Sequence, residues 1–197
     1  FIVPFGRIAD IYGRRRVFLA GMVVVIVSSL LCSISSGVYM LIASRMVEGV
    51  GSAMIFGTSI AILSSVFPLR ERGRVLGINV AAAYLGLSSG PILGGIITAH
   101  VGWRFIYLGV AVYSLLALAI ARWKIREEWR CAQEGEFDAT GSILYAAMLL
   151  ALIYGLTIIP DRMGALLLLV ALVVLIIFLR WENENANPVL KVNLLRN

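Results

Sequence analysis

Residues 6–44 read GRIADIYGRRRVFLAGMVVVIVSSLLCSISSGVYMLIAS, a cluster of charges followed by a long apolar run. After Arg16, no charged side chain occurs until Arg45. A helix needs roughly 20 apolar residues to cross the ~30 Å hydrocarbon core of a bilayer, and lipid offers no partner for the backbone of an open strand. The stretch therefore predicts two membrane-spanning helices, separated by a short turn at Ser35-Ser36-Gly37.

The rest of the chain repeats this alternation of apolar runs and charged connections. Of the 197 residues, 60% are hydrophobic and only 14% are charged, whereas about 25% of the residues of a soluble domain are charged. We therefore predict an all-α, polytopic transmembrane helical bundle. The end of a first helix is placed at 1–5, and complete spans at 17–34, 38–66, 75–98, 104–122, 140–159 and 163–180.

Lysine and arginine are unevenly distributed between alternate connections. Fourteen of the seventeen lie in one set, two lie in the other set, and Arg45 lies inside a span. Basic residues favour the cytoplasmic side of a membrane. We therefore predict a multi-pass protein of the cell (plasma or inner) membrane, with cytoplasmic segments at 6–16, 67–74, 123–138 and the C-terminal end.

The expected organisation has four parts, and both ends of the chain are expected to be cuts in a longer protein because it starts at Phe1. The parts are an N-terminal transmembrane bundle (1–122), a cytoplasmic loop (123–139), two additional linker helices (140–180) and a cytoplasmic segment (181–197) leading to a further bundle.

One histidine and two scattered cysteines, Cys32 and Cys131, predict no metal site and two unpaired thiols.

The charged cluster at 6–16 is predicted to be a tight loop between two spans. Gly6 and Gly13 permit unusual backbone dihedrals, and Asp10 can accept charge-assisted hydrogen bonds from the neighbouring arginines. An ordinary basic loop would explain the arginines, but not an aspartate placed between two glycines.

Arg45 and Glu48 lie inside the predicted span 38–66. Three residues apart, they share a helix face and can pair. A charge inside a membrane costs about 2.5–3.5 kcal/mol on insertion scales, so such residues are functional candidates. Two interpretations stay open: a neutralised structural pair near the membrane edge, or a proton-linked site facing a central cavity.

Three further strings each have a structural interpretation. In GLSSGPILGG (86–95), the spacing of Gly86 and Gly90 lets two helices approach closely, and Pro91 removes a helical hydrogen bond. In WRFIY (103–107), the aromatic residues suit a membrane interface. In FDATGSIL (137–144), Asp138 or Thr140 can cap the following helix.

In this order, the strings resemble motifs of the fourteen-helix drug/proton antiporters of the major facilitator superfamily. The cluster at 6–16 matches the signature loop Gly-x-x-x-Asp-x-x-Gly-Arg-(Lys/Arg), and RMVEGVGSA (45–53) matches the fourth-helix motif except at Glu48, where Gln is usual. The resemblance singles out a cytoplasmic latch (Gly6, Arg7, Asp10, Gly13, Arg14, Arg15), a proton-linked pair (Arg45, Glu48), an antiporter motif (Gly86, Gly90, Pro91, Gly94, Gly95) and the opening of the seventh helix (Asp138, Gly141).

The resemblance implies a major facilitator fold covering the end of helix 2 through helix 8. It also implies a secondary transporter, not an enzyme, that couples proton entry to the export of small, lipophilic or cationic compounds (drug efflux). We expect no cofactor beyond the proton gradient, and as partners the lipid bilayer, protons and a small-molecule substrate, but no nucleic acid. The alternatives are a proton-coupled importer, and a channel or permease subunit.

Overall fold

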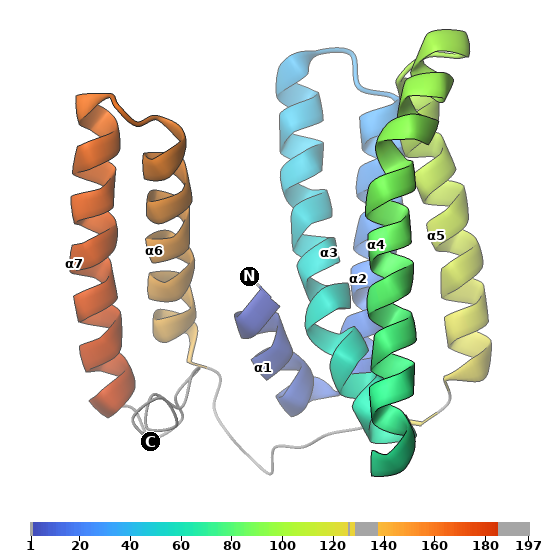
Figure 1. Cartoon of the computed structure of the whole chain (residues 1–197), viewed down its shortest axis with the longest axis horizontal. Helices are drawn as coiled ribbons and strands as arrows, with labels where there is room; N and C mark the ends of the chain where they lie inside the picture. The colour runs from blue at the N-terminus through green and yellow to red at the C-terminus, as the bar shows by residue number, and fades with distance from the viewer. Residues whose placement is uncertain (1, 126, 129–137, 185–197) are drawn as a thin grey trace. The chain divides into compact units, whose positions relative to one another are not determined.

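The computed structural model describes residues 2–125, 127–128 and 138–184 (Figure 1). Within these residues, all regular secondary structure is α-helical, and six helices are long and apolar enough to cross a membrane. The helices are α1 (Ile2–Tyr12), α2 (Arg14–Ser33), α3 (Val38–Val66), α4 (Leu69–His100), α5 (Arg104–Lys124), α6 (Ala139–Thr157) and α7 (Arg162–Glu184). The predicted fold class is confirmed.

The six predicted spans correspond to α2 through α7, and α3 has the predicted bounds. The prediction of a loop at 6–16 was wrong. Helix α1 continues to Tyr12 and α2 begins at Arg14, so only Gly13 interrupts the helical path. Gly13 has a φ of 113°, in the left-handed region that glycine tolerates.

The predicted connection 67–74 is also mostly helical, because α4 begins at Leu69, directly after Pro68. A helix satisfies its own backbone hydrogen bonds in water as well as in lipid. A charged sequence such as 69–74 can therefore extend a helix beyond the bilayer, and Glu71 favours this first turn through the helix dipole.

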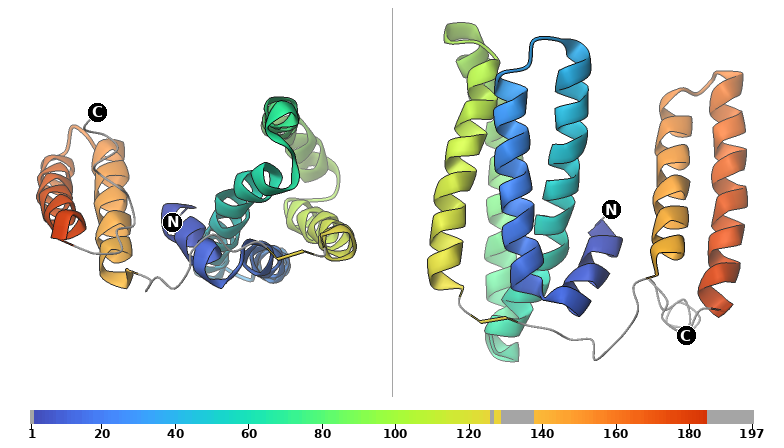
Figure 2. Two further views of the ribbon diagram at one scale, coloured as in Figure 1. Left: turned by 90° about the horizontal axis from the view of Figure 1, so that it is seen from below. Right: turned by 180° about the vertical axis from the view of Figure 1, so that it is seen from behind.

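The chain divides into two compact units, which are described separately here. The first is built from α1–α5. In it, α2 lies between α3 and α5 (Figure 2). No residue of α4 is buried, and this helix makes only limited contact with α3 and α5.

Small residues allow α2 and α3 to pack closely. A Cβ atom added to Gly51 would lie 2.9 Å from the Gly21 carbonyl oxygen, and one added to Gly21 would lie 2.9 Å from the Gly51 carbonyl oxygen. The largest fully buried side chains are also small: Thr58, Cys32, Ser28, Ser29 and Ser35. Close packing of small residues is the usual basis of helix association in lipid.

The second unit is the hairpin of α6 and α7. Near its turn, a Cβ atom on Gly164 would lie 2.9 Å from the Gly155 carbonyl oxygen. Further along, the rings of Tyr145 and Phe178 have centroids 5.8 Å apart. The two helices therefore contact each other both at a glycine crossing and through aromatic side chains.

Candidate functional site

Asp10 and Arg14 form an ion pair where α1 meets α2. The Asp10 Oδ1 atom lies 2.9 Å from Arg14 Nε and 2.8 Å from Arg14 Nη2. The remaining terminal nitrogen, Arg14 Nη1, donates to the Ala61 carbonyl oxygen at 3.1 Å and to the Ser65 hydroxyl at 2.8 Å. Asp10 thus orients a guanidinium group that ties the junction to the last turns of α3.

Glu128, which follows α5, occupies the amino-terminal end of α2. Its Oε1 atom accepts hydrogen bonds from the backbone amides of Arg15 at 3.0 Å and Arg16 at 3.4 Å, and its Oε2 atom lies 3.6 Å from Arg16 Nε. A carboxylate is favourable there because the amides are unpaired and the helix dipole is positive. A Cβ atom on Gly13 would collide with this carboxylate.

Glu128 was not among the site residues predicted from the sequence. The sequence shows it only as an acidic residue just beyond a predicted span. Its hydrogen-bond partner Arg15 lies 113 positions earlier in the chain. Arg15 Nε donates to the carbonyl oxygen of Ile125. The basic segment 13–16, the end of α3 and the segment after α5 therefore meet at one end of the first unit.

The other two residues of the predicted latch lie in α1. Gly6 faces α3, where a Cβ atom would be 3.7 Å from the Gly57 carbonyl oxygen. The Nε atom of Arg7 is buried and has no hydrogen-bond partner among the described residues. Arg7 does not join the contact between Asp10 and Arg14.

Arg45 and Glu48 are paired, as their spacing predicts. Arg45 Nη1 lies 2.8 Å from Glu48 Oε2. Glu48 is only 8% exposed, whereas more than half of the Arg45 side chain is exposed. Two residues from neighbouring helices complete the cluster. The Cys32 thiol donates to the same Glu48 oxygen at 3.9 Å, and the Arg45 guanidinium carbon lies 5.8 Å from the Tyr107 ring centroid.

This cluster lies near the end of the unit opposite to the Asp10–Arg14 pair. Cys32 is the penultimate residue of α2, and Tyr107 belongs to the first turn of α5. Glu48 lies about 15 Å from the amino-terminal end of α3, at 1.5 Å per residue. It can still contact the last turn of α2, because the amino-terminal end of α3 extends beyond the end of α2 (Figure 1).

The glycines of the predicted antiporter motif lie on α4. A Cβ atom on Gly86, Gly90 or Gly95 would meet no atom of the described structure within 4 Å outside its own helix, and one on Gly94 would approach only Ile106, at 3.7 Å. The described part of the chain therefore does not cover the face of α4 on which these glycines lie. The motif, which also includes Pro91, remains a prediction.

Asp138 caps α6, which confirms one of the two predicted caps. Its Oδ1 atom accepts a hydrogen bond from the Gly141 amide at 2.8 Å. The indole of Trp181 in α7 donates to both carboxylate oxygens, at 3.2 and 3.1 Å. Asp138 thereby links the first turn of α6 to the last turns of α7.

Replacing Asp138 with alanine should destabilise the hairpin by about 1–2 kcal/mol, because the cap and the indole partner are both lost. Unfolding in denaturant, followed by Trp181 fluorescence in a full-length variant lacking other tryptophans, measures this loss. The Thr140→Ala variant is the matched control, since Thr140 is exposed and does not supply the cap. An equal loss in both variants would contradict the assignment of the cap to Asp138.

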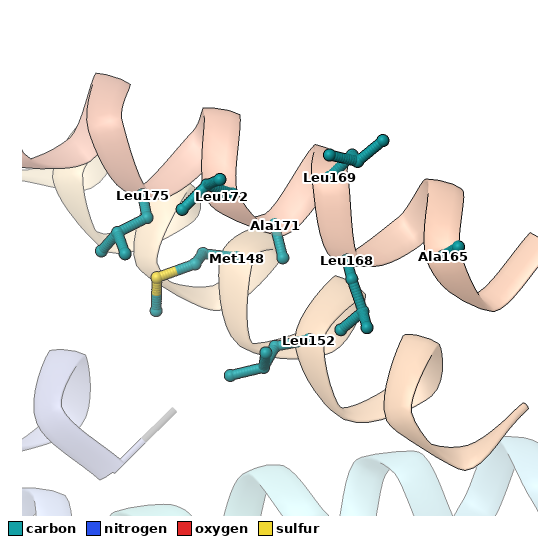
Figure 3. Close-up of a pocket in the computed structure, with 8 residues that line it drawn as sticks. All are labelled: Met148, Leu152, Ala165, Leu168, Leu169, Ala171, Leu172 and Leu175. Atoms are coloured by element: carbon teal, nitrogen blue, oxygen red, sulfur yellow. The ribbon is translucent and has the colours of Figure 1, made fainter. Parts of the chain in front are cut away.

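A groove of about 600 Å³ lies along α6 and α7 (Figure 3). The side chains that line it are all apolar: Met148, Leu152, Ala165, Leu168, Leu169, Ala171, Leu172 and Leu175. Such a surface suits lipid chains and offers no group that could orient a polar ligand. Among the described residues, no cluster of three or more His, Cys, Asp or Glu side chains could hold a metal ion. Cys32 is free and buried, and Cys131 lies outside the described residues.

The order of these motif residues along membrane-crossing helices matches a known family. A family model of the Major Facilitator Superfamily covers residues 1–129, more than half of the chain. The chain belongs to the Major Facilitator Superfamily. Together with the six candidate spans, this membership makes it a multi-pass membrane protein.

Three relatives extend the comparison. The chain is 30% identical to the multidrug resistance protein Stp of Mycobacterium tuberculosis, over 100% of the chain and 37% of Stp. It is also 30% identical to the riboflavin transporter RibZ of Clostridioides difficile, over 89% of the chain and 38% of RibZ. A third relative is the uncharacterized MFS-type transporter EfpA of M. tuberculosis, at 30% identity over 97% of the chain and 37% of EfpA. The chain thus spans well under half the length of these relatives.

Proposed function

We propose that the full-length protein is a proton-coupled antiporter of the cell membrane. It would export small, lipophilic or cationic compounds by alternating access between two helical bundles. The observation that carries the proposal is the buried Glu48 carboxylate, paired with Arg45 inside a membrane-spanning helix. A carboxylate in such a place is a natural proton carrier. Similarity to Stp, a multidrug resistance protein, supports the choice of substrate class.

In the proton step, Glu48 would alternate between a carboxylate paired with Arg45 and a neutral acid. Protonation removes the charge that holds the guanidinium at 2.8 Å. The pair therefore has two states of different geometry, and a shift between them can bias a conformational equilibrium.

Asp10 and Arg14 would close the cytoplasmic side as a latch, held to α3 through Ala61 and Ser65. The basic segments that meet at this end of the first unit support a cytoplasmic position for it. The glycines at positions 86, 90, 94 and 95, together with Pro91, would form a packing seam on α4 against helices that follow the described chain. The opening of α6 at Asp138 and Gly141 would belong to two linker helices, α6 and α7.

The partners proposed for this protein are protons, a small-molecule substrate and the bilayer, and its energy source is the proton gradient without a further cofactor. Transport in proteoliposomes holding the full-length protein tests the direction of coupling. A lipophilic cation such as ethidium should leave the compartment into which protons flow. Ethidium movement in the same direction as protons would instead establish an importer.

The second candidate, a proton-coupled importer, is favoured by the similarity to RibZ, a riboflavin transporter. Riboflavin in the same proteoliposomes separates the two candidates. Uptake of riboflavin together with protons, without ethidium export, would support the importer.

Replacing Glu48 with glutamine should remove the pH dependence of transport, because glutamine keeps the size of the side chain but cannot take up the proton. The rate of ethidium export across a pH series in proteoliposomes measures this. The exposed Glu71 provides the control, since Glu71→Gln makes the same chemical change outside the membrane core. An unaltered pH profile in Glu48→Gln would make the pair structural.

A further inference from the structure

Arg45 lies between two partners from different helices. One is the Glu48 carboxylate on its own helix, and the other is the aromatic ring of Tyr107 on α5. The ion pair is tight, at 2.8 Å. The ring contact, at 5.8 Å from the guanidinium carbon to the centroid, is near the outer limit of about 6 Å for a cation–π interaction.

We propose that Tyr107 is a positioning residue for the proton-linked pair, whose ring holds the Arg45 guanidinium when Glu48 takes up a proton. The inference rests on the proposed function, in which Glu48 carries the proton. It adds the group that keeps Arg45 stable once the carboxylate is neutral.

The physical need for such a group follows from charge. When the proton binds the Glu48 carboxylate, Arg45 keeps its own proton and loses its counter-charge. An unpaired cation in a membrane-spanning segment is costly. The guanidinium can regain part of that free energy by moving closer to the ring face, because the present distance leaves room for a stronger contact.

The ring itself is held in place by a chain of contacts. Tyr107 packs edge-to-face on Trp103, with centroids 6.0 Å apart. The Arg104 guanidinium lies 4.4 Å from the Trp103 ring centroid and donates to the Ser35 carbonyl oxygen at 2.8 Å. The ring therefore has a contact of its own that does not depend on Arg45, and the Arg45 side chain, with several rotatable bonds, can turn toward it.

The other groups around Glu48 do not replace the ring. From α2, the Cys32 thiol reaches Glu48 Oε2 at 3.9 Å, but it contributes no negative charge while it is a thiol. Among the described residues of α4, none forms a hydrogen bond or an ion pair with Arg45 or Glu48. Among those residues, Tyr107 is the aromatic ring positioned over Arg45.

The test is infrared difference spectroscopy of the purified full-length protein across a pH series. The carboxylic acid band that disappears in Glu48→Gln reports the pH midpoint of Glu48 protonation. Tyr107→Phe keeps the ring face and should leave this midpoint within a few tenths of a unit. Tyr107→Leu should move it by about half to one pH unit toward acid, because the protonated state loses its support for Arg45.

A trifluorinated phenylalanine at position 107 keeps the shape of the side chain but weakens the attraction of the ring for cations. It should shift the midpoint in the same direction as leucine, and it covers the case in which Tyr107→Leu fails to fold. Equal midpoints in the phenylalanine and fluorinated variants would overturn the role of Tyr107 and leave the proton assignment intact. If the wild-type protein shows no band that depends on Glu48 between about pH 4 and 9, both the proton assignment and this inference fail.

Discussion

Replacing Asp10 with asparagine should abolish transport by the full-length protein while its amount in the membrane stays normal. The ion pair to Arg14 would become a neutral contact, and the guanidinium that reaches Ala61 and Ser65 would lose its charged partner. A half-buried pair of this kind contributes on the order of 1–3 kcal/mol. That is too little to unfold a large bundle, but it can shift a conformational equilibrium by about 5- to 150-fold.

The measurement is ethidium export from proteoliposomes, normalised to the reconstituted protein. Asp161→Asn provides the matched control, because Asp161 is exposed in the turn between α6 and α7. Normal transport by Asp10→Asn would remove the latch role. A Ser65→Ala variant should show a partial loss, because Arg14 keeps both Asp10 and the Ala61 carbonyl.

Replacing Gly51 with alanine should sharply lower the yield of folded protein. The new methyl group would lie 2.9 Å from the Gly21 carbonyl oxygen, and also 2.9 Å from the side chains of Val24 and Val25. The backbone oxygen cannot move without separating α2 from α3. Overpacking of this kind costs about 1–3 kcal/mol, and separation of the helices would add to that cost.

Gly49→Ala is the control for this experiment, and it comes from the same motif. No described atom outside the helix lies within 4 Å of a Cβ atom at Gly49, and alanine favours a helix over glycine by about 1 kcal/mol. The two variants should therefore change thermal stability in opposite directions, as measured on purified protein. Equal tolerance at both positions would show that α2 and α3 do not cross closely at Gly51.

The spans could be predicted from sequence because bilayer thickness sets a length, and charge marks where each apolar run stops. The ends of the helices were predicted less accurately than the spans. The charged stretch 6–12 looks like a loop, but it continues α1 because a helix needs no lipid to satisfy its backbone. Only Gly13, with its positive φ, breaks the path.

Local pairs were predictable and distant ones were not. The spacing of Arg45 and Glu48 on one helix predicts their contact, and the position of Asp138 before an apolar run predicts a cap. Tyr107 suggested only an interfacial residue, because its place beside Arg45 depends on how α3 and α5 pack. Glu128 depends in the same way on a long-range contact with the start of α2.

The hairpin of α6 and α7 is fastened to itself at both ends, by the crossing of Gly155 and Gly164 near its turn and by Asp138 and Trp181 at its open end. A helix pair with contacts of its own at both ends does not need the first unit to hold it together, so the two helices can associate within a bilayer before they meet other helices.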